Sequence, residues 1–385
     1  MVKFTILAGG FSTFIASYLF DSDASTLTLV KQSQTGENPS WIASHPQNRS
    51  ILYAVNEISP VGNLQSFIVA LDGSLTLVDT VSSGGNGPTF SNPLSTGEVS
   101  AMNYGSPNCS LVATVPGDPL HFQKDSPVVE FPVGDGPSHP HMSLEYNGEV
   151  FVADLGADKI WRLANDGAPG KFKVQGQINV EVGTGPRHLA IHDDVLFTVN
   201  ELSSTLTAQQ IPAAPNNTAL PLLANVSVVP ETTLNSSFAA AELLISTPSQ
   251  KFPSPLIYIS NRNLGPEFDE RGDTIAIFEF KRGATAPECT TSRSEKRMMR
   301  RKHKRQSVGA EGNGSLTLVT QVYTGLKQIR SMSLGPVEGG GDEFLVAGAN
   351  MDGGVVIFQR IDGGRNLKEV ARNVEIQNRT SFVFI

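Results

Sequence analysis

The stretch Ser50-Ile-Leu-Tyr-Ala-Val-Asn56-Glu57 decides the fold, because the same kind of phrase returns along the whole chain. Each copy is a short apolar run with strand-like alternation that ends in a polar or charged residue before a turn. The other copies end, clearly or weakly, at Gly9, Asn103, Asp154, Asn200, Asn261 and Asn350. A period near fifty residues in a strand-rich chain is typical of a β-propeller, and seven copies predict seven blades.

The segments around each marker run complete the expected blade. A second recurring phrase lies upstream, as in Gly185-Pro-Arg187-His188, and alternating runs such as Leu64-Gln-Ser-Phe-Ile-Val-Ala70 lie downstream. Four short antiparallel strands per repeat fit this pattern, so we expect an all-β, seven-bladed propeller. The chain opens on what we take as an inner strand and ends on the apolar strand Thr380–Ile385, which predicts that the two terminal strands pair and close the ring. A β-sandwich with irregular spacing is the alternative.

We expect one domain over residues 1–385, interrupted by a basic insertion at about 284–313. The insertion carries a cluster of Lys and Arg with almost no apolar residues, and such a segment cannot bury enough surface to order itself. A disordered insertion is the favoured interpretation. Polyanion binding or a nuclear-import signal is the functional alternative.

Composition excludes several classes of function. The net charge of −8 and the pI near 5.4 argue against general nucleic-acid binding. No apolar run approaches the roughly 20 residues of a membrane span, and the N-terminal apolar run, broken by Gly9-Gly10, is interpreted as a strand and not a signal peptide. Only Cys109 and Cys289 are present, which favours the cytoplasm, while seven Asn-X-Ser/Thr sequons leave a secreted form open.

Polar and charged residues at the ends of the apolar runs are the candidate site. Because propeller strands crowd around the axis, these side chains should converge on one central pocket. The candidates are Glu57, Asn103, Asp154, Glu201 and Arg262 after the marker runs, and His139, His141, Arg187, His188 and Arg330 in the upstream phrases. Histidine can move protons near neutral pH, and arginine presents donors suited to carboxylate or phosphate. Together they describe a pocket for a small anion with acid–base capability.

Some candidates have a structural alternative. Asp154 could tie one blade to the next through backbone amides, and His139 could be a turn residue beside Pro140. His141, Arg187, Glu201 and Arg262 are harder to explain in this way, because charged residues at repeat positions are costly if buried unpaired. No phosphate-binding loop, nucleophile elbow or His-Glu-x-x-His zinc motif competes with this site.

These phrases resemble one known family over nearly the whole chain apart from the insertion. Gly185-Pro-Arg-His-Leu-Ala-Ile-His192, Phe197-Thr-Val-Asn-Glu201, Tyr53-Ala-Val-Asn-Glu57 and Ile259-Ser-Asn-Arg262 are similar to the seven-bladed lactonases. That family includes bacterial-type 6-phosphogluconolactonases and fungal carboxy-cis,cis-muconate cyclases. The resemblance implies a catalytic set of His141, Arg187, Glu201 and Arg262. Ser331 and the phrase Pro88-Thr-Phe-Ser-Asn92 depart from it, since many relatives carry His there.

The resemblance implies a lactonase acting on a sugar lactone, most directly 6-phosphoglucono-1,5-lactone. Arg187 and Arg262 would hold the phosphate or the carbonyl oxygen, His141 would take a proton from water, and Glu201 would orient it or share the base role. No metal or cofactor is required. The open alternatives are cyclisation of a carboxylated muconate in the same pocket, and a non-catalytic propeller that binds a ligand or a protein. The oligomeric state cannot be read from the sequence.

Overall fold

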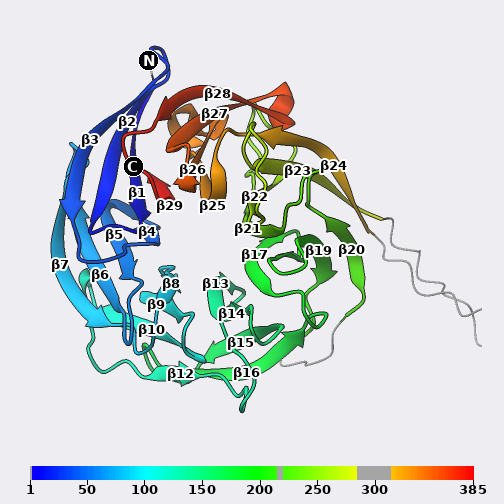
Figure 1. Ribbon diagram of the computed structural model, residues 1–385. Coiled ribbons are helices and arrows are strands. Elements are labelled where there is room, and N and C mark those ends of the chain that lie inside the picture. The colour runs from blue at the N-terminus through cyan, green and yellow to red at the C-terminus, as the bar shows by residue number, and fades with distance from the viewer. Residues whose placement is uncertain (1, 215–219, 284–313) are drawn as a thin grey trace, which may run out of the picture.

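The computed structural model describes residues 2–214, 220–283 and 314–385. Within these ranges the chain forms seven antiparallel sheets arranged in a ring, which confirms the predicted seven-bladed propeller (Figure 1). The expected insertion at 284–313 lies outside the described residues. None of the described residues belongs to a helix with the length and apolar character needed to cross a bilayer.

In each blade the strands follow one another from the centre of the ring outward. Blade 1 consists of β29 (Arg379–Phe384), β1 (Lys3–Gly10), β2 (Phe14–Asp21) and β3 (Thr26–Gln34). Blade 2 consists of β4 (Ile42–His45), β5 (Asn48–Asn56), β6 (Asn63–Val69) and β7 (Leu75–Ser82). Blade 3 consists of β8 (Pro88–Phe90), β9 (Glu98–Asn103), β10 (Asn108–Val115) and β11 (Asp118–Phe122), with β12 (Val128–Glu130) also paired to β10.

The remaining blades repeat the four-strand order. Blade 4 consists of β13 (Pro140–Tyr146), β14 (Glu149–Asp154), β15 (Lys159–Asn165) and β16 (Phe172–Asn179). Blade 5 consists of β17 (Pro186–His192), β18 (Val195–Asn200), β19 (Thr205–Gln210) and β20 (Leu222–Ser227). Blade 6 consists of β21 (Phe238–Ile245), β22 (Ile257–Asn263), β23 (Thr274–Arg282) and β24 (Gly314–Tyr323). Blade 7 consists of β25 (Lys327–Leu334), β26 (Phe344–Asp352), β27 (Val355–Ile361) and β28 (Asn366–Asn373), with the short 3-10 turns η3 (Glu338–Glu343) and η4 (Asp362–Gly364) beside them.

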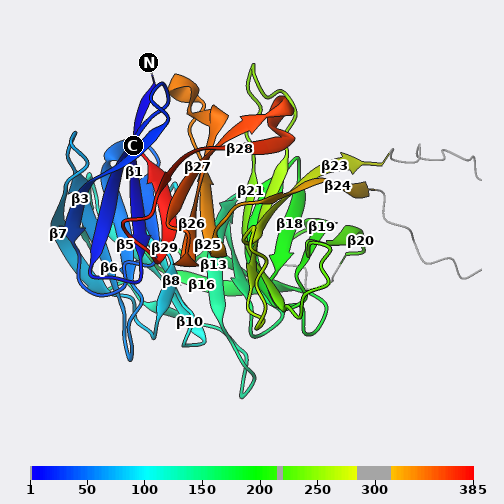
Figure 2. The same ribbon diagram turned by 45° about the horizontal axis from the view of Figure 1, so that its top comes forward.

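The ring closes through the two terminal strands, as the sequence predicts. β29 pairs antiparallel with β1, with Ile6 opposite Phe384 and Ala8 opposite Phe382. Both chain ends therefore lie in blade 1 (Figure 2). The Thr380 hydroxyl also donates to the Ser40 carbonyl at 2.8 Å, which ties the closing strand to blade 2. Closure in this way removes the open sheet edge that would otherwise invite pairing with another chain.

The marker runs are inner strands but not the innermost ones. Those runs form β1, β5, β9, β14, β18, β22 and β26, each second from the centre, and the upstream phrases form the innermost strands. Both kinds of strand are apolar on alternate residues and buried on both faces, so periodicity alone does not tell them apart. The ends of the marker runs still lie close to the central channel, because each run pairs antiparallel with the innermost strand of its own blade.

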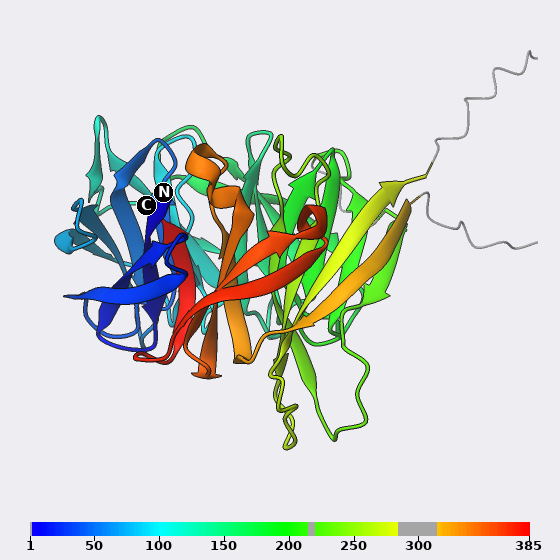
Figure 3. The ribbon, with the colours of Figure 1, turned by 90° about the horizontal axis from the view of Figure 1, so that it is seen from above.

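Apolar side chains between neighbouring blades form the core. Phe4, Phe20, Phe344 and Phe384, for example, pack edge to face between blades 1 and 7, with ring centroids 4.8 to 6.4 Å apart. Burying one such side chain contributes about 2–3 kcal/mol. Seen from the edge, the blades stand in one tier around the axis (Figure 3), so the innermost strands hold fixed positions around the channel.

Candidate functional site

The innermost strands carry β-bulges where the site lies. The pairing of β8, β13, β17 and β25 with the next strand of each blade leaves out Thr89, His141, Arg187 and Arg330 respectively. A bulged residue has no partner in the ladder, so its side chain is turned away from the alternation of the strand. All four side chains line a single cavity at the centre of the ring.

This central cavity has a volume of about 200 Å³ and draws on six of the seven blades. Its lining residues are Glu57, Thr89, Tyr104, His141, Arg187, Glu201, Arg262 and Arg330. The residues that do not come from bulges stand at or just beyond the ends of the second strands. Six of the ten residues predicted for the site are therefore brought together: His141, Arg187, Glu201, Arg262, Glu57 and Arg330.

Glu201 joins two of the arginines. Its Oε2 atom lies 2.7 Å from Nε of Arg187 and 2.8 Å from Nη2 of Arg262. Burial by itself raises the pKa of Glu201, but Arg187 and Arg262 outweigh it, so the pKa is lowered and the carboxylate is charged. A carboxylate held in this way is a poor proton acceptor and a good anchor for the two guanidinium groups.

The arginines lie at different depths. Arg187 is only 1% exposed, and burial, with the nearby charge of Arg262, lowers its pKa to about 9 although Glu201 opposes this. Its Nη1 atom donates to the Ala241 carbonyl at 2.8 Å. Arg330 is more open and pairs with Glu57 at 3.3 Å. Three guanidinium groups against two carboxylates leave a net positive charge, which suits an anionic ligand.

His141 is the buried imidazole of the cavity. Burial lowers its pKa well below the ordinary value, and the positive charge of Arg187 is the largest charge effect in the same direction. It is therefore neutral at physiological pH and can accept a proton. The ring of Tyr104 meets it edge to face at 5.9 Å, and burial raises the pKa of Tyr104, so that hydroxyl stays protonated.

Four predicted site residues lie outside the cavity lining. His188 is fully buried beneath it, with Nδ1 2.7 Å from Oε1 of Glu242. His139 stacks on Tyr104 at 4.6 Å and contacts its carbonyl, so it supports a cavity residue. Asn103 and Asp154 are held by the scaffold.

The two scaffold residues satisfy local groups. Asp154 accepts hydrogen bonds from the Ser138 hydroxyl, the His139 and Ala157 amides and the Trp161 indole. Asn103 donates to the Ser83 carbonyl at 2.8 Å and to Asn108 at 2.9 Å. Asp154 therefore has the structural role of an acceptor for backbone amides, but its partners belong to blade 4 itself and not to a neighbouring blade. The structure does not bring either residue to the cavity.

Sequence reasoning missed Thr89, Tyr104 and Glu242. Thr89 follows Pro88 as His141 follows Pro140 and Arg187 follows Pro186, so aligning the repeats on their proline would have found it. Tyr104 directly follows a marker residue. Glu242 lies in the apolar run of β21, where nothing in the sequence marks a bulge.

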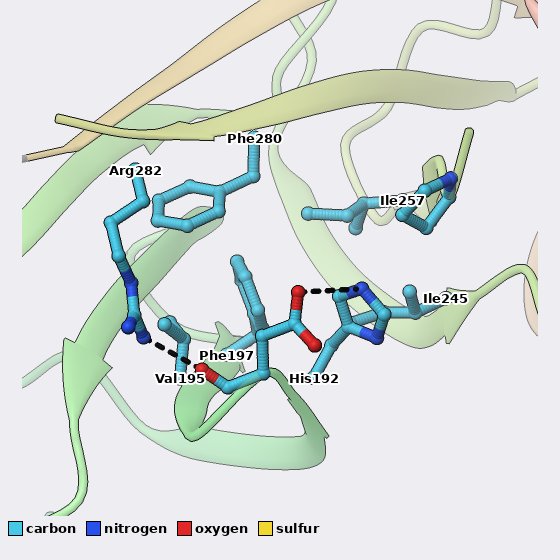
Figure 4. Close-up of a pocket in the computed structure, with 9 residues that line it drawn as sticks. His192, Val195, Phe197, Ile245, Ile257, Phe280 and Arg282 are labelled. Atoms are coloured by element: carbon cyan, nitrogen blue, oxygen red, sulfur yellow. Dashed lines mark hydrogen bonds and ion pairs between the residues drawn. The ribbon is translucent and has the colours of Figure 1, made fainter. Parts of the chain in front are cut away.

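A second cavity, of about 210 Å³, is lined by residues of blades 5 and 6 (Figure 4). Its walls are largely apolar, with Phe197, Ile257 and Phe280, and the polar contacts at its edge join Asp193 to Arg282 and His192. It gathers no cluster of charges like that of the central cavity, so the central cavity is the candidate active site. In the described ranges, His, Cys, Asp and Glu side chains form no group of three or more suited to a metal ion.

Comparison with known proteins agrees with this fold. The sequence pattern of the family described as "Lactonase, 7-bladed beta-propeller" matches residues 5–301, and the chain belongs to this family. A probable 6-phosphogluconolactonase of Arthroderma benhamiae is 29% identical over 261 residues, which are 64% of each chain. The 6-phosphogluconolactonase of Yersinia pestis is 25% identical over 244 residues, 62% of this chain and 68% of that one. The chain thus spans less than two thirds of the length of the first of these relatives.

Solved structures share the architecture. A protein from Lactobacillus plantarum superposes with a TM-score of 0.76 at 21% identity, covering 100% of this chain and 99% of that one. The periplasmic gluconolactonase of Pseudomonas aeruginosa gives 0.74 at 18% identity, covering 100% and 99%. At these identities the likeness concerns the fold alone.

Proposed function

We propose that the central cavity hydrolyses a sugar lactone, and that 6-phosphoglucono-1,5-lactone is its substrate. The observation that carries the proposal is one neutral, buried imidazole, His141, beside three guanidinium groups in a cavity sized for a small molecule. The names of the relatives from Arthroderma benhamiae and Yersinia pestis support the choice of a phosphorylated lactone.

The depth of each arginine in the cavity suggests which part of the substrate it would bind. Arg262 and Arg330, which are 13% and 17% exposed, would hold the phosphate toward the mouth of the cavity. Arg187 is more deeply buried and has the strongest charge effect on His141, so it would receive the carbonyl oxygen next to that imidazole. A guanidinium fixed by Glu201 and by the Ala241 carbonyl is already oriented when negative charge develops on that oxygen.

The reaction needs only proton transfer and charge stabilisation. His141 takes a proton from a water molecule while the oxygen of that water attacks the carbonyl carbon. Arg187 stabilises the resulting oxyanion. The tetrahedral intermediate then breaks the bond between the carbonyl carbon and the ring oxygen. The imidazolium of His141 returns the proton to that oxygen, which leaves a hydroxy acid and a neutral imidazole.

Glu201 is an anchor in this scheme and not the base. It is paired with Arg187 and Arg262, and its pKa is lowered. Replacing it would therefore disturb the placement of both arginines more than it would remove a proton acceptor.

A substrate panel tests the proposal. Purified protein is assayed by the proton released on hydrolysis of 6-phosphoglucono-1,5-lactone and of glucono-1,5-lactone, and by the absorbance of carboxy-cis,cis-muconate. The proposal predicts a kcat/KM highest for the phosphorylated lactone. Turnover of the muconate alone would establish the cyclase instead, and no turnover of any of the three would support a binding module.

A further inference from the structure

A polar layer lies directly beneath the central cavity. Its members are His188 and Ser331, which each follow a bulged residue, and Glu242. His188 of blade 5 is fully buried and reaches other blades: its ring centroid lies 5.1 Å from that of His141, 5.5 Å from Trp41 and 5.8 Å from Phe90. A side chain that meets blades 2, 3 and 4 from blade 5 stands close to the axis of the ring, so it forms the floor of the site.

A further bulge, in β21, places a carboxylate in this layer. The pairing of β21 with β22 skips Ala241 and Glu242 between Ala240 and Leu243. Glu242 is only 4% exposed, and its Oε1 and Oε2 atoms lie 2.7 Å from Nδ1 of His188 and 2.8 Å from the Ser331 hydroxyl. The Leu243 amide donates to the same carboxylate at 3.1 Å. One bulge thus provides the carbonyl that orients Arg187 and the carboxylate that orients His188.

Two buried imidazole nitrogens have no hydrogen-bond partner in the described part of the chain. With Nδ1 of His188 donating to Glu242, its Nε2 is a bare acceptor, and this atom is buried with no hydrogen-bond partner in the described part of the chain. Nδ1 of His141 is also buried and has no partner there. The two rings have their centroids 5.1 Å apart. A buried polar atom without a hydrogen bond lowers the stability of the folded protein, so these two nitrogens are expected to bond to each other, directly or through a water molecule.

We propose that His188 and Glu242 are positioning residues for His141, in the chain Glu242–His188–His141. Nδ1–H of His141 is directed at Nε2 of His188, and Nδ1–H of His188 donates to Glu242. This fixes the tautomer of His141 and leaves its Nε2 as the proton acceptor toward the cavity. When His141 takes the proton of the attacking water, the Glu242 carboxylate stabilises the positive charge through His188. The kinetic part of the inference rests on the proposed hydrolysis.

The charges around the chain set the sign of its pH dependence. His141 faces Arg187, Arg330 and Arg262 from blades 5, 7 and 6, all of which lower its pKa. His188 is also near Arg187, while Glu242 and Glu201 favour its charged form, although burial dominates and lowers its pKa. Loss of the Glu242 charge would therefore make the histidine pair a weaker base.

Nitrogen-15 NMR of the free protein tests the chain without any substrate. Imidazole shifts at neutral pH should show both His141 and His188 protonated on Nδ1 and bare on Nε2. If His188 or His141 carries its proton on Nε2, the chain is overturned. This result is independent of whether the protein hydrolyses a lactone.

Kinetics with Glu242→Gln tests the functional consequence. The variant should lower kcat on 6-phosphoglucono-1,5-lactone by roughly 10- to 100-fold, the range seen when the carboxylate that orients a metal-binding histidine is replaced, and KM should stay within about twofold. The acid limb of its kcat/KM profile should move to lower pH. Glu98→Gln is the matched control, because Glu98 is also buried, at 2% exposed. It lies in β9, away from the cavity, and accepts a hydrogen bond from the Gly170 amide. The positioning role would be overturned if Glu242→Gln left both kcat and the acid limb unchanged. It would also be overturned if Glu98→Gln changed them as much as Glu242→Gln does.

Discussion

Replacing Glu201 by Gln should destabilise the protein through the arginines that it anchors. The carboxylate lies 2.7 Å from Arg187 and 2.8 Å from Arg262, and it is 17% exposed. Removing one partner of a buried ion pair costs about 3–5 kcal/mol, since it leaves a buried charge uncompensated. Arg187 is 1% exposed, and among the described residues its remaining bond would be the one to the Ala241 carbonyl. Because Glu201 is partly open to solvent, we expect the lower end of that range, about 3 kcal/mol.

The pH dependence of this loss identifies its cause. The folded-state pKa of Glu201 is lowered, so its contribution to stability is present above the pKa of the unfolded chain and disappears as pH falls through the folded value. Urea unfolding followed by tryptophan fluorescence should therefore show a large difference between the unfolding free energies of the two proteins at pH 7, and this difference should shrink as the pH falls below the ordinary pKa of glutamate. A difference below about 1 kcal/mol at pH 7, or one that persists in acid, would refute the reasoning.

Three further predictions concern the cavity and its support. Since the pKa of His141 is lowered by burial and by Arg187, kcat/KM should stay level from neutral pH to below the ordinary histidine pKa of about 6.5 before it falls. A pH–rate profile whose acid limb has an apparent pKa at or above that value would contradict this prediction. Arg330→Met should raise KM at least about tenfold for the phosphorylated lactone but only slightly for glucono-1,5-lactone; equal effects on both would place the phosphate elsewhere. Asp154→Ala should lower the free energy of unfolding by about 3 kcal/mol, because four donors lose their acceptor, and urea unfolding measures this loss. The KM of the protein that remains folded should be unchanged, since Asp154 does not line the cavity.

The architecture could be predicted from the sequence because it depends on a repeat. The spacing of Asn56, Asn103 and Asp154 is enough to predict the propeller, and the unpaired terminal strand predicts its closure. The order of strands within a blade could not be predicted, since innermost and second strands have the same apolar alternation.

The site was predictable as a set of residues but not as a geometry. Arg187 and His188 are neighbours in sequence, yet one lines the cavity and the other lies beneath it. The difference comes from a bulge at Arg187, and a bulge changes which face a side chain occupies without changing the composition of the strand. For the same reason Glu242 could not be found from the sequence, whereas Asp154, conspicuous at the end of a marker run, holds the scaffold.

The central claim is that His141 takes the proton in a hydrolysis carried out in the central cavity. The most direct test compares the wild type with His141→Ala on 6-phosphoglucono-1,5-lactone at pH 7, with folding of both checked by circular dichroism. We predict hydrolysis by the wild type and a loss in kcat of about 100-fold or more in the variant, with little change in KM, as removal of a general base requires. Equal rates for the two proteins, or no hydrolysis by the wild type, would contradict the account.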